Sequence, residues 1–260
     1  MIKVIKIGGN VVDNEELLQK FCKDFAALEG EKVLVHGGGV MASRIQEALG
    51  RKPVMVEGRR VTDEETLKIV SMVYGGWCSK HIVASLQKYG CNAIGLSGCD
   101  ANVVTASRRA PRILSDGVTK VDYGFVGNVT PESVNVPVIR TFIASGMVPV
   151  LNAINHDGAG SLLNTNADTI ASSVAAALGG ELLYLFEKKG VLYDVKDDES
   201  VIPSMNVEMY LKLRAEGKID KGMIPKLDNA FGAIERGAMG VVIRHSGDLL
   251  NENAGTRLVL

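Results

Sequence analysis

Short apolar runs alternate with longer amphipathic stretches along almost the whole chain. Val, Ile and Leu dominate the runs, which end at glycine or polar residues, as the strands of a covered sheet do. The longer stretches repeat apolar residues every three or four positions, which is typical of helices with one buried face. The predicted strands are 2–7, 32–36, 91–96, 102–107, 123–129, 147–152, 182–186 and 240–244. The predicted helices follow Asp13 and Gly39 and cover 63–88, 131–145, 167–180, 206–217 and 225–237.

This alternation of strands and helices predicts an α/β protein with a largely parallel sheet and helices on both faces. Asp13 is the expected N-cap of the first helix, with Glu16 at capping-box distance. The segment 98–130 is rich in turns and short strands, which indicates an antiparallel patch beside the main sheet. No repeat or linker divides the chain, so we expect one compact unit.

Composition narrows the classes of function. The chain has 260 residues, of which 46% are hydrophobic and 23% charged, as in a globular protein with a substantial core. Its 29 basic and 30 acidic residues nearly cancel, which argues against a nucleic-acid or membrane partner. The four cysteines show no C-x-x-C spacing, and there is no export signal or membrane-spanning run, so we predict reduced thiols and a cytoplasmic location.

Glycine-rich breaks follow three of the predicted strands, at Gly8-Gly9, at 37–39 and at Gly190. Glycine at a strand end lets backbone N–H groups approach an anion closely, and a following helix adds its positive end. Each break alone is explained equally well by a tight turn. The first break is preceded by a charge inside a strand, Lys6, and this arrangement favours an anion site at the carboxyl ends of the strands.

The chain lacks one common nucleotide-binding motif and carries a weak form of another. The chain has no G-x-x-x-x-G-K-[ST] and therefore no P-loop. "GGGVMA" (37–42) fits G-x-G-x-x-A after a strand, and Glu57 follows about 20 residues later, as in a dinucleotide fingerprint. An NAD-dependent oxidoreductase is therefore one alternative, although a complete strand–helix unit precedes the motif.

Polar residues gather in two later segments. Asn164, Asn166 and Asp168 alternate, so in an extended segment they share one face, although an Asx-rich helix cap explains them equally well. In "DKGMIPKLDNA" (220–230), Pro225 suits the first turn of a helix and Lys226 lies in that turn. A lysine there opposes the helix dipole, and an anion at the same place would offset this cost.

Lys6-Ile-Gly-Gly, "VHGGG" (35–39), "GRRVTD" (58–63), "LLNTNAD" (162–168) and "KGMIPK" (221–226) together resemble the amino-acid kinase family, in order over nearly the whole chain. The resemblance is greatest to the branch that phosphorylates the side-chain carboxylate of an N-acyl-glutamate, N-acetyl by default, in arginine biosynthesis. It implies a three-layer sandwich with an open, mainly parallel eight-stranded sheet between helices. One kinase domain would span 1–260, with an N-lobe of about 1–165 for the amino acid and the dimer interface and a C-lobe of about 166–260 for the nucleotide.

The resemblance also implies the site. Lys6 and Lys226 match the two catalytic lysines, and Asp168 matches the aspartate that organises them. Gly38, Gly39, Arg60 and Asn164 are the implied substrate-binding residues. The segments 187–192 and 218–223 would line the nucleotide. The implied nucleotide-binding residues are Gly8, Gly9, Asn166, Glu187, Lys189, Gly190, Gly222 and Met223. The substrates would be ATP and the small N-acyl-glutamate, with Mg²⁺ carried by ATP and no direct protein ligand.

Phosphoryl transfer to a carboxylate fits these residues chemically. It needs positioning and positive charge around the phosphoryl oxygens. A glutamate side chain, with a pKa of about 4.3, is ionised at neutral pH and needs no general base. His36, beside the second glycine break, is therefore interpreted as a structural turn residue. Other kinases of the family, acting on carbamate, aspartate, glutamate or UMP, and an inactive metabolite sensor remain alternatives.

Two positions depart from the family pattern. Glu187 stands at the start of the nucleotide segment, where Asp is common, and the pair Lys188-Lys189 that follows it is unusual. Arg59 stands where "GLRVT" is typical, and it would suit an acyl group with its own carboxylate, such as N-succinyl, although adjacent side chains on a strand point apart. The chain also begins directly at its first strand, without the extra N-terminal helix of arginine-inhibited relatives. We therefore expect a homodimer without strong arginine feedback.

Overall fold

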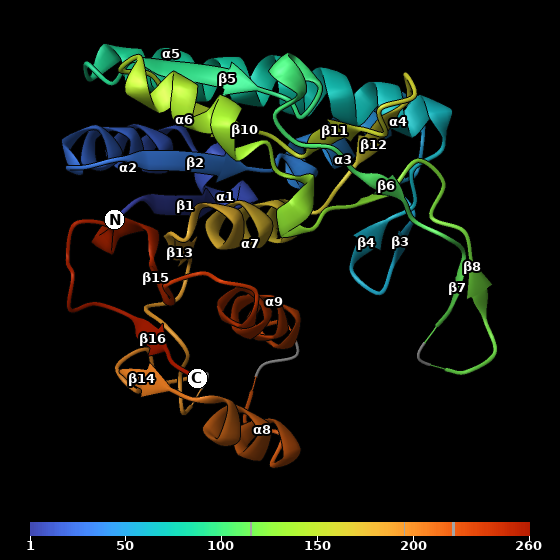
Figure 1. The fold of residues 1–260 in the computed structure, drawn as a ribbon. Helices are drawn as coiled ribbons and strands as arrows, with labels where there is room; N and C mark the ends of the chain where they lie inside the picture. Colours follow the sequence, from blue (N-terminus) through green and yellow to red (C-terminus); the bar gives the residue numbers. More distant parts are fainter. Residues whose placement is uncertain (115, 195, 220–221) are drawn as a thin grey trace.

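The computed structural model describes residues 1–114, 116–194, 196–219 and 222–260. Within them one eight-stranded sheet is formed by β1 (Lys3–Ile7), β2 (Lys32–His36), β5 (Ala93–Leu96), β10 (Val148–Leu151), β13 (Glu181–Phe186), β14 (Ser204–Met205), β15 (Gly240–His245) and β16 (Thr256–Leu258). The strand order is β14-β16-β15-β13-β1-β2-β10-β5, and all neighbours are parallel except β15 and β16 (Figure 1). The predicted mainly parallel eight-stranded sheet is confirmed.

Helices cover both faces of this sheet. They are α1 (Gly9–Val12), α2 (Glu15–Ala27), α3 (Gly39–Ala48), α4 (Glu64–Ser71), α5 (Ser79–Lys88), α6 (Val136–Ala144), α7 (Ala167–Leu178), α8 (Val207–Ala215) and α9 (Ile224–Glu235), with short 3₁₀ turns at Asp100–Asn102, Pro131–Ser133 and Ser246–Asp248. Helices α6, α7 and α9 lie along one face, and α2 and α5 along the other (Figure 1). The three-layer arrangement is confirmed. No described helix is long and apolar enough to cross a membrane.

In the described residues, four antiparallel two-stranded sheets lie outside the main sheet. They pair β3 (Met55–Val56) with β4 (Arg59–Arg60), β6 (Ser107–Arg108) with β9 (Gly127–Asn128), β7 (Arg112–Ile113) with β8 (Lys120–Val121), and β11 (Ile154–His156) with β12 (Leu162–Asn164). The expected antiparallel patch within 98–130 is confirmed. The strands predicted over 102–107 and 123–129 are wrong in extent, because only Ser107 of the first and Gly127–Asn128 of the second belong to a strand.

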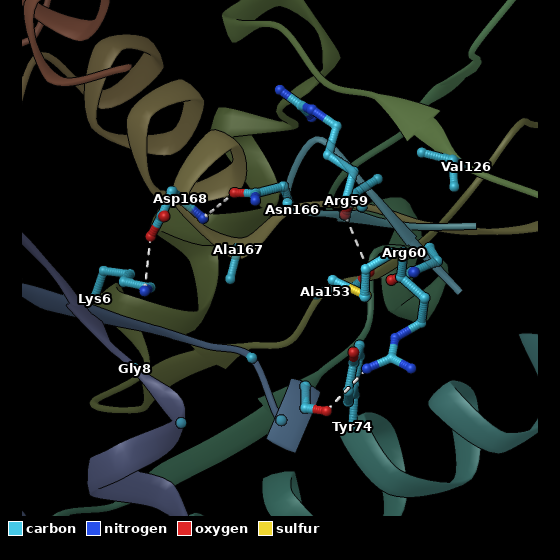
Figure 2. Close-up of a pocket in the computed structure, with 18 of the residues that line it drawn as sticks. Lys6, Gly8, Arg59, Arg60, Tyr74, Val126, Ala153, Asn166, Ala167 and Asp168 are labelled. Atoms are coloured by element: carbon cyan, nitrogen blue, oxygen red, sulfur yellow. Dashed lines mark hydrogen bonds and ion pairs between the residues drawn. The ribbon is translucent and has the colours of Figure 1, made fainter. Parts of the chain in front are cut away.

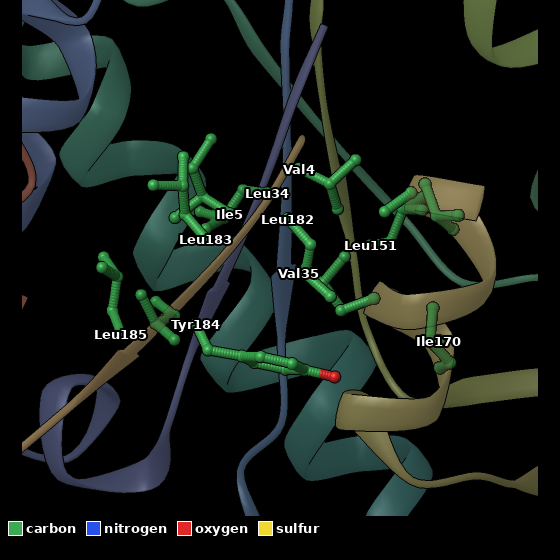
Figure 3. Packing of buried hydrophobic residues seen from close by; sticks show 14 of the residues in the cluster. Val4, Ile5, Leu34, Val35, Leu151, Ile170, Leu182, Leu183, Tyr184 and Leu185 are labelled. Atoms are coloured by element: carbon green, nitrogen blue, oxygen red, sulfur yellow. The ribbon is translucent and has the colours of Figure 1, made fainter. Parts of the chain in front are cut away.

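The central strands are buried on both faces. Figure 3 shows Val4, Leu182 and Tyr184 on the α7 side of the sheet and Ile5, Leu34 and Leu183 on the other side. All six residues of β13 are buried, which agrees with its apolar run from Leu182 to Phe186. Because side chains alternate along β1, Lys6 shares the face of Val4 and points toward the α7 layer.

Two predicted helices differ in detail. The first is capped by Asn14, whose side chain accepts a hydrogen bond from the Leu17 amide, and not by Asp13, which ends the short helix α1. The helix expected over 63–88 is present and is capped by Asp63, but its middle is a π-helix, Met72–Cys78. A π segment inside an α-helix often accompanies a functional site, and this one contacts the cavity described next.

Candidate active site

A cavity of about 240 Å³ opens where β1, β2 and β10 end. Its position at the carboxyl ends of parallel strands agrees with the rule for open α/β sheets. Nine of the predicted site residues line it, namely Lys6, Gly8, Gly9, Gly38, Gly39, Arg60, Asn164, Asn166 and Asp168. Of the lining side chains that the structure describes, Lys6, Arg59 and Arg60 are basic and Asp168 is acidic. The cavity therefore suits anionic ligands.

Lys6 and Asp168 form an ion pair at one side of the cavity (Figure 2). The Lys6 Nζ lies 2.7 Å from Asp168 Oδ1, and the two side chains are only 9% and 15% exposed. The register places Lys6 opposite Tyr184, whose hydroxyl donates a hydrogen bond to the Asp168 carbonyl. The lysine inside the first strand therefore points at the N-terminal turn of α7.

The segment before α7 serves both as a helix cap and as a cavity wall. Asn166 Oδ1 accepts hydrogen bonds from the amides of Asp168 and Thr169, so Asn166 is the N-cap of α7. The extended alternation predicted for 164–168 ends at Asn164, because the helix begins at Ala167. Asn166 is therefore a helix cap that also lines the cavity.

Asn164 is buried with one half of its amide satisfied. Its Nδ2 donates to Thr62 Oγ1 at 3.0 Å, whereas its Oδ1 is buried without a hydrogen-bond partner among the described residues. A buried carbonyl oxygen left without a donor costs free energy. A ligand that presents an N–H group here would satisfy it.

The second glycine break is packed against the π-helix. A Cβ on Gly38 would lie 2.8 Å from Tyr74 Cδ1 and 2.9 Å from Cys78 Sγ, so only glycine fits without a shift. Tyr74 is itself buried, lines the cavity and has a pKa raised by its burial. The sequence analysis did not predict that Tyr74 lines the cavity. The pair Gly75-Gly76 inside a helical run was the one signal in the sequence that this segment is unusual.

Arg60 is held in place by the helix that follows this break. Its guanidinium donates to Gln46 Oε1 at 2.7 Å, to Ser43 Oγ at 2.8 Å and to the Gly39 carbonyl at 2.9 Å. The side chain is buried and lines the cavity, so its position is fixed before any ligand arrives. Its remaining N–H donors suit a carboxylate.

Lys226 lies outside the cavity wall but close to it. Its Nζ is 3.9 Å from the centroid of the Phe186 ring, and Lys6 Nζ is 5.7 Å from the same ring. Phe186 is the last residue of β13, and Lys226 lies in the first turn of α9. The structure thus brings both predicted lysines to one aromatic ring, which sequence reasoning missed.

The other residues expected at the nucleotide lie away from this cavity. Lys188 and Lys189 are exposed and pair with Asp198 and Glu199, whereas Gly190 is buried against Thr256. The remaining ones in the described chain are Glu187 and Gly222, which are exposed, and Met223, which is half-buried. Residues 220–221, part of the segment 218–223, lie outside the described residues.

His36 is structural, as expected. It ends β2 fully buried, with Nδ1 2.7 Å from the Gly37 carbonyl oxygen. Burial lowers its pKa from 6.5 to about 4, so the ring is neutral at neutral pH. Glu57 lies in the turn between β3 and β4 and pairs with Arg112, so it does not follow a strand of the main sheet as the dinucleotide fingerprint requires.

A model of the Amino acid kinase family matches residues 1–245, and the chain belongs to that family. It is 50% identical to the acetylglutamate kinase of Cytophaga hutchinsonii over 98% of this chain and 97% of the relative. It is 38% identical to the acetylglutamate kinase of Methanopyrus kandleri over 98% of this chain and 99% of the relative. The family match and the place of Glu57 argue against the oxidoreductase alternative.

Solved structures agree on the fold. The smu.665 protein of Streptococcus mutans matches with a TM-score of 0.79 and 28% identity, over 99% of this chain and 98% of that one. The N-acetylglutamate synthase of Neisseria gonorrhoeae matches with a TM-score of 0.81 and 22% identity, over 100% of this chain and 59% of that one. At this identity the synthase is similar in fold alone.

Proposed function

We propose that the chain transfers the γ-phosphoryl group of ATP to the side-chain carboxylate of an N-acyl-L-glutamate, in arginine biosynthesis. The observation that carries the proposal is the nearly buried Lys6–Asp168 ion pair, which lies in one cavity with the two glycine-rich turns. The names of the relatives, which are acetylglutamate kinases at up to 50% identity, support the same reaction.

The residues at one side of the cavity would each have a separate role in the phosphoryl transfer. A side-chain carboxylate oxygen attacks the γ-phosphorus, the bond to the β-phosphate oxygen breaks, and ADP leaves. Lys6 offsets the negative charge on the phosphoryl oxygens, and Asp168 holds the lysine Nζ in place. Gly8 and Gly38 line the same cavity, and we propose that their backbone N–H groups donate to these oxygens.

The amino acid would be held at the opposite side of the cavity. The fixed guanidinium of Arg60 suits the α-carboxylate, and the open Oδ1 of Asn164 suits the N–H of the acylated amino group. An N-acyl group keeps that nitrogen neutral, so it arrives as a donor and not as a cation. Free glutamate, with its ammonium group, would lack the acyl contacts.

We place the nucleotide in the C-lobe of about 166–260 and the amino acid in the N-lobe of about 1–165. Lys226 supports this division, because it shares the Phe186 ring with Lys6 and comes from the C-lobe. Glu187, Lys189, Gly190, Gly222 and Met223 remain the proposed nucleotide contacts.

Mg²⁺ would be held on the phosphates of ATP, where it supplies positive charge during transfer. Among the described residues no group of three or more His, Cys, Asp or Glu side chains could hold a metal ion. Asp168, the acidic residue of the described cavity wall, is already paired with Lys6. We propose that the metal arrives with the nucleotide. We further propose that the chain is cytoplasmic and forms a homodimer. Size-exclusion chromatography with light scattering would test the dimer.

ADP release and acyl phosphate should be measured together. The full chain is offered ATP with N-acetyl-L-glutamate, N-succinyl-L-glutamate or free L-glutamate, and the acyl phosphate is trapped with hydroxylamine. We expect equal amounts of ADP and hydroxamate with an N-acylated compound and neither with free glutamate. ADP without hydroxamate, or hydroxamate from free glutamate, would refute the proposal.

A further inference from the structure

Three arginines gather beside the cavity, apart from Arg60. Arg59 lines the cavity, while the guanidinium groups of Arg109 and Arg112 lie 5.7 and 6.0 Å from the centroid of the Tyr123 ring. We call Arg59, Arg109 and Arg112 the arginine edge. The proposed reaction assigns no role to it.

The backbone holds the arginine edge together. Two residues after the strand that carries Arg59, the Thr62 amide donates to the Tyr123 carbonyl at 2.9 Å. The amide of Arg109 donates to the carbonyl of Val126 at 2.8 Å, and Val126 lines the cavity. Three segments far apart in sequence thus meet at one end of the cavity.

A tight turn directs the Arg59 side chain. Glu57 and Gly58 have φ angles of +46° and +72°, as a two-residue hairpin turn requires, and Arg112 pairs with Glu57 at its tip. The side chains of Arg59 and Arg60 leave the strand on opposite sides (Figure 2). Both nevertheless line the cavity, which removes the geometric objection to a role for Arg59.

The charges of the arginine edge are poorly balanced within the protein. Arg112 has Glu57, whereas neither Arg59 nor Arg109 has an acidic side chain within 4 Å among the described residues. Arg109 is anchored by a neutral partner, with its Nε 2.9 Å from Asn128 Oδ1. Its burial, and then the charges of Arg59 and Arg112, lower its pKa. An anion at this end would offset the repulsion.

The arginine edge lies away from the phosphoryl end of the cavity. Figure 2 shows Lys6 and Asp168 on one side, and Arg59, Arg60 and Val126 on the other. Arg60 is anchored to α3 and is assigned to the α-carboxylate. An N-acetyl group would bring only a methyl group toward Arg59, whereas an N-succinyl group extends further by a methylene and a carboxylate.

We propose that the arginine edge binds a second carboxylate on the acyl group, so that the preferred substrate is an N-acyl-glutamate of the N-succinyl class. This inference rests on the proposed function and names its substrate. Arg59 would donate to the carboxylate directly, and Arg109 and Arg112 would add positive charge. A charge-assisted pair of this kind corresponds to about tenfold to a hundredfold in affinity.

Binding is measured separately from turnover. Isothermal titration calorimetry of the full chain compares N-succinyl-L-glutamate with N-acetyl-L-glutamate, in wild type, Arg59→Leu, Arg59→Lys and Arg108→Leu. Arg108 is the matched control, because it is an exposed arginine next to Arg109 and does not line the cavity. Its guanidinium lies 5.0 Å from the centroid of the Phe125 ring. Hydroxamate formation is measured with both compounds in parallel.

We expect wild type to bind the succinyl compound at least tenfold more tightly than the acetyl compound. Arg59→Leu should abolish most of this preference, Arg59→Lys should keep part of it, and Arg108→Leu should keep all of it. Equal affinities in wild type, equal losses for both ligands in Arg59→Leu, or no binding of either ligand would overturn the inference. A succinyl preference in binding without hydroxamate from either compound would support the arginine edge and refute the kinase.

Discussion

Replacing Lys6 and Asp168 singly and together separates the contribution of their ion pair to stability from its contribution to catalysis. The two side chains are 9% and 15% exposed, and their charged atoms are 2.7 Å apart. At an effective dielectric constant of about 20 the attraction is roughly 6 kcal/mol, offset in part by the cost of desolvating both groups. Removing one partner leaves the other charged and nearly buried, which costs about 3–5 kcal/mol.

We therefore expect Asp168→Asn and Lys6→Met each to lower the free energy of unfolding by about 3 kcal/mol. The double variant should be more stable than either single variant, because no unpaired charge remains. Activity should not follow this recovery. All three variants should lose about 10²–10³ in kcat, because none presents an oriented lysine to the phosphoryl group.

Urea unfolding gives the free energies, and ADP release at saturating ATP and N-acyl-glutamate gives kcat. Gln19→Ala is a suitable control, because Gln19 bonds Glu15 and Ser85 on α2 and α5, away from the cavity. Wild-type kcat in Asp168→Asn, or full activity in the double variant, would show that the pair is structural only. Strictly additive losses of stability would refute the coupling.

Three further predictions concern Gly38, His36 and Lys226. Gly38→Ala should lower the free energy of unfolding in urea by about 1–3 kcal/mol, because its Cβ would lie 2.8 Å from Tyr74. Gly76→Ala should not lower it, because the space around Gly76 is open. Equal stabilities of the two variants would contradict this. Burial lowers the pKa of His36 to about 4, so the unfolded chain takes up the proton first as pH falls from about 6.5, and wild type should lose up to about 3 kcal/mol by pH 4. Unfolding measured across this range should show no such loss in His36→Asn, and identical pH profiles would refute the assignment. Lys226→Met should lower kcat for ADP release about 10²-fold while Lys226→Arg keeps part of it, and an unchanged kcat would exclude the lysine from the transfer step.

The central fold was predictable because its signals are local. The strands 32–36 and 182–186 are built on the apolar runs 33–35 and 182–186, and burial on both faces favours that pattern. The two short strands at one end of the sheet, β14 and β16, have two and three residues, too few to show a period, and no prediction covered them. The cap was misassigned to Asp13 because Gly9–Val12 folds as a separate helical turn, which shifts the cap to Asn14.

The site was predictable only in part for a related reason. Lys6, Arg60 and Asp168 follow from motifs carried by short segments, and the structure brings all three to one cavity. The contact of Tyr74 with Gly38, and the contacts of Phe186 with the two lysines, join elements that are far apart in the sequence. Such contacts leave no periodicity in the sequence.

The most direct test of the central claim follows the oxygen atoms. N-acyl-L-glutamate labelled with ¹⁸O in its side-chain carboxylate is incubated with ATP and the full chain, and hydroxylamine then cleaves the acyl phosphate at its carbonyl carbon. Our account predicts that the released inorganic phosphate carries one ¹⁸O atom from the substrate, as read by mass spectrometry. Phosphate without label, formed in step with ADP, would mean that water and not the carboxylate attacks ATP.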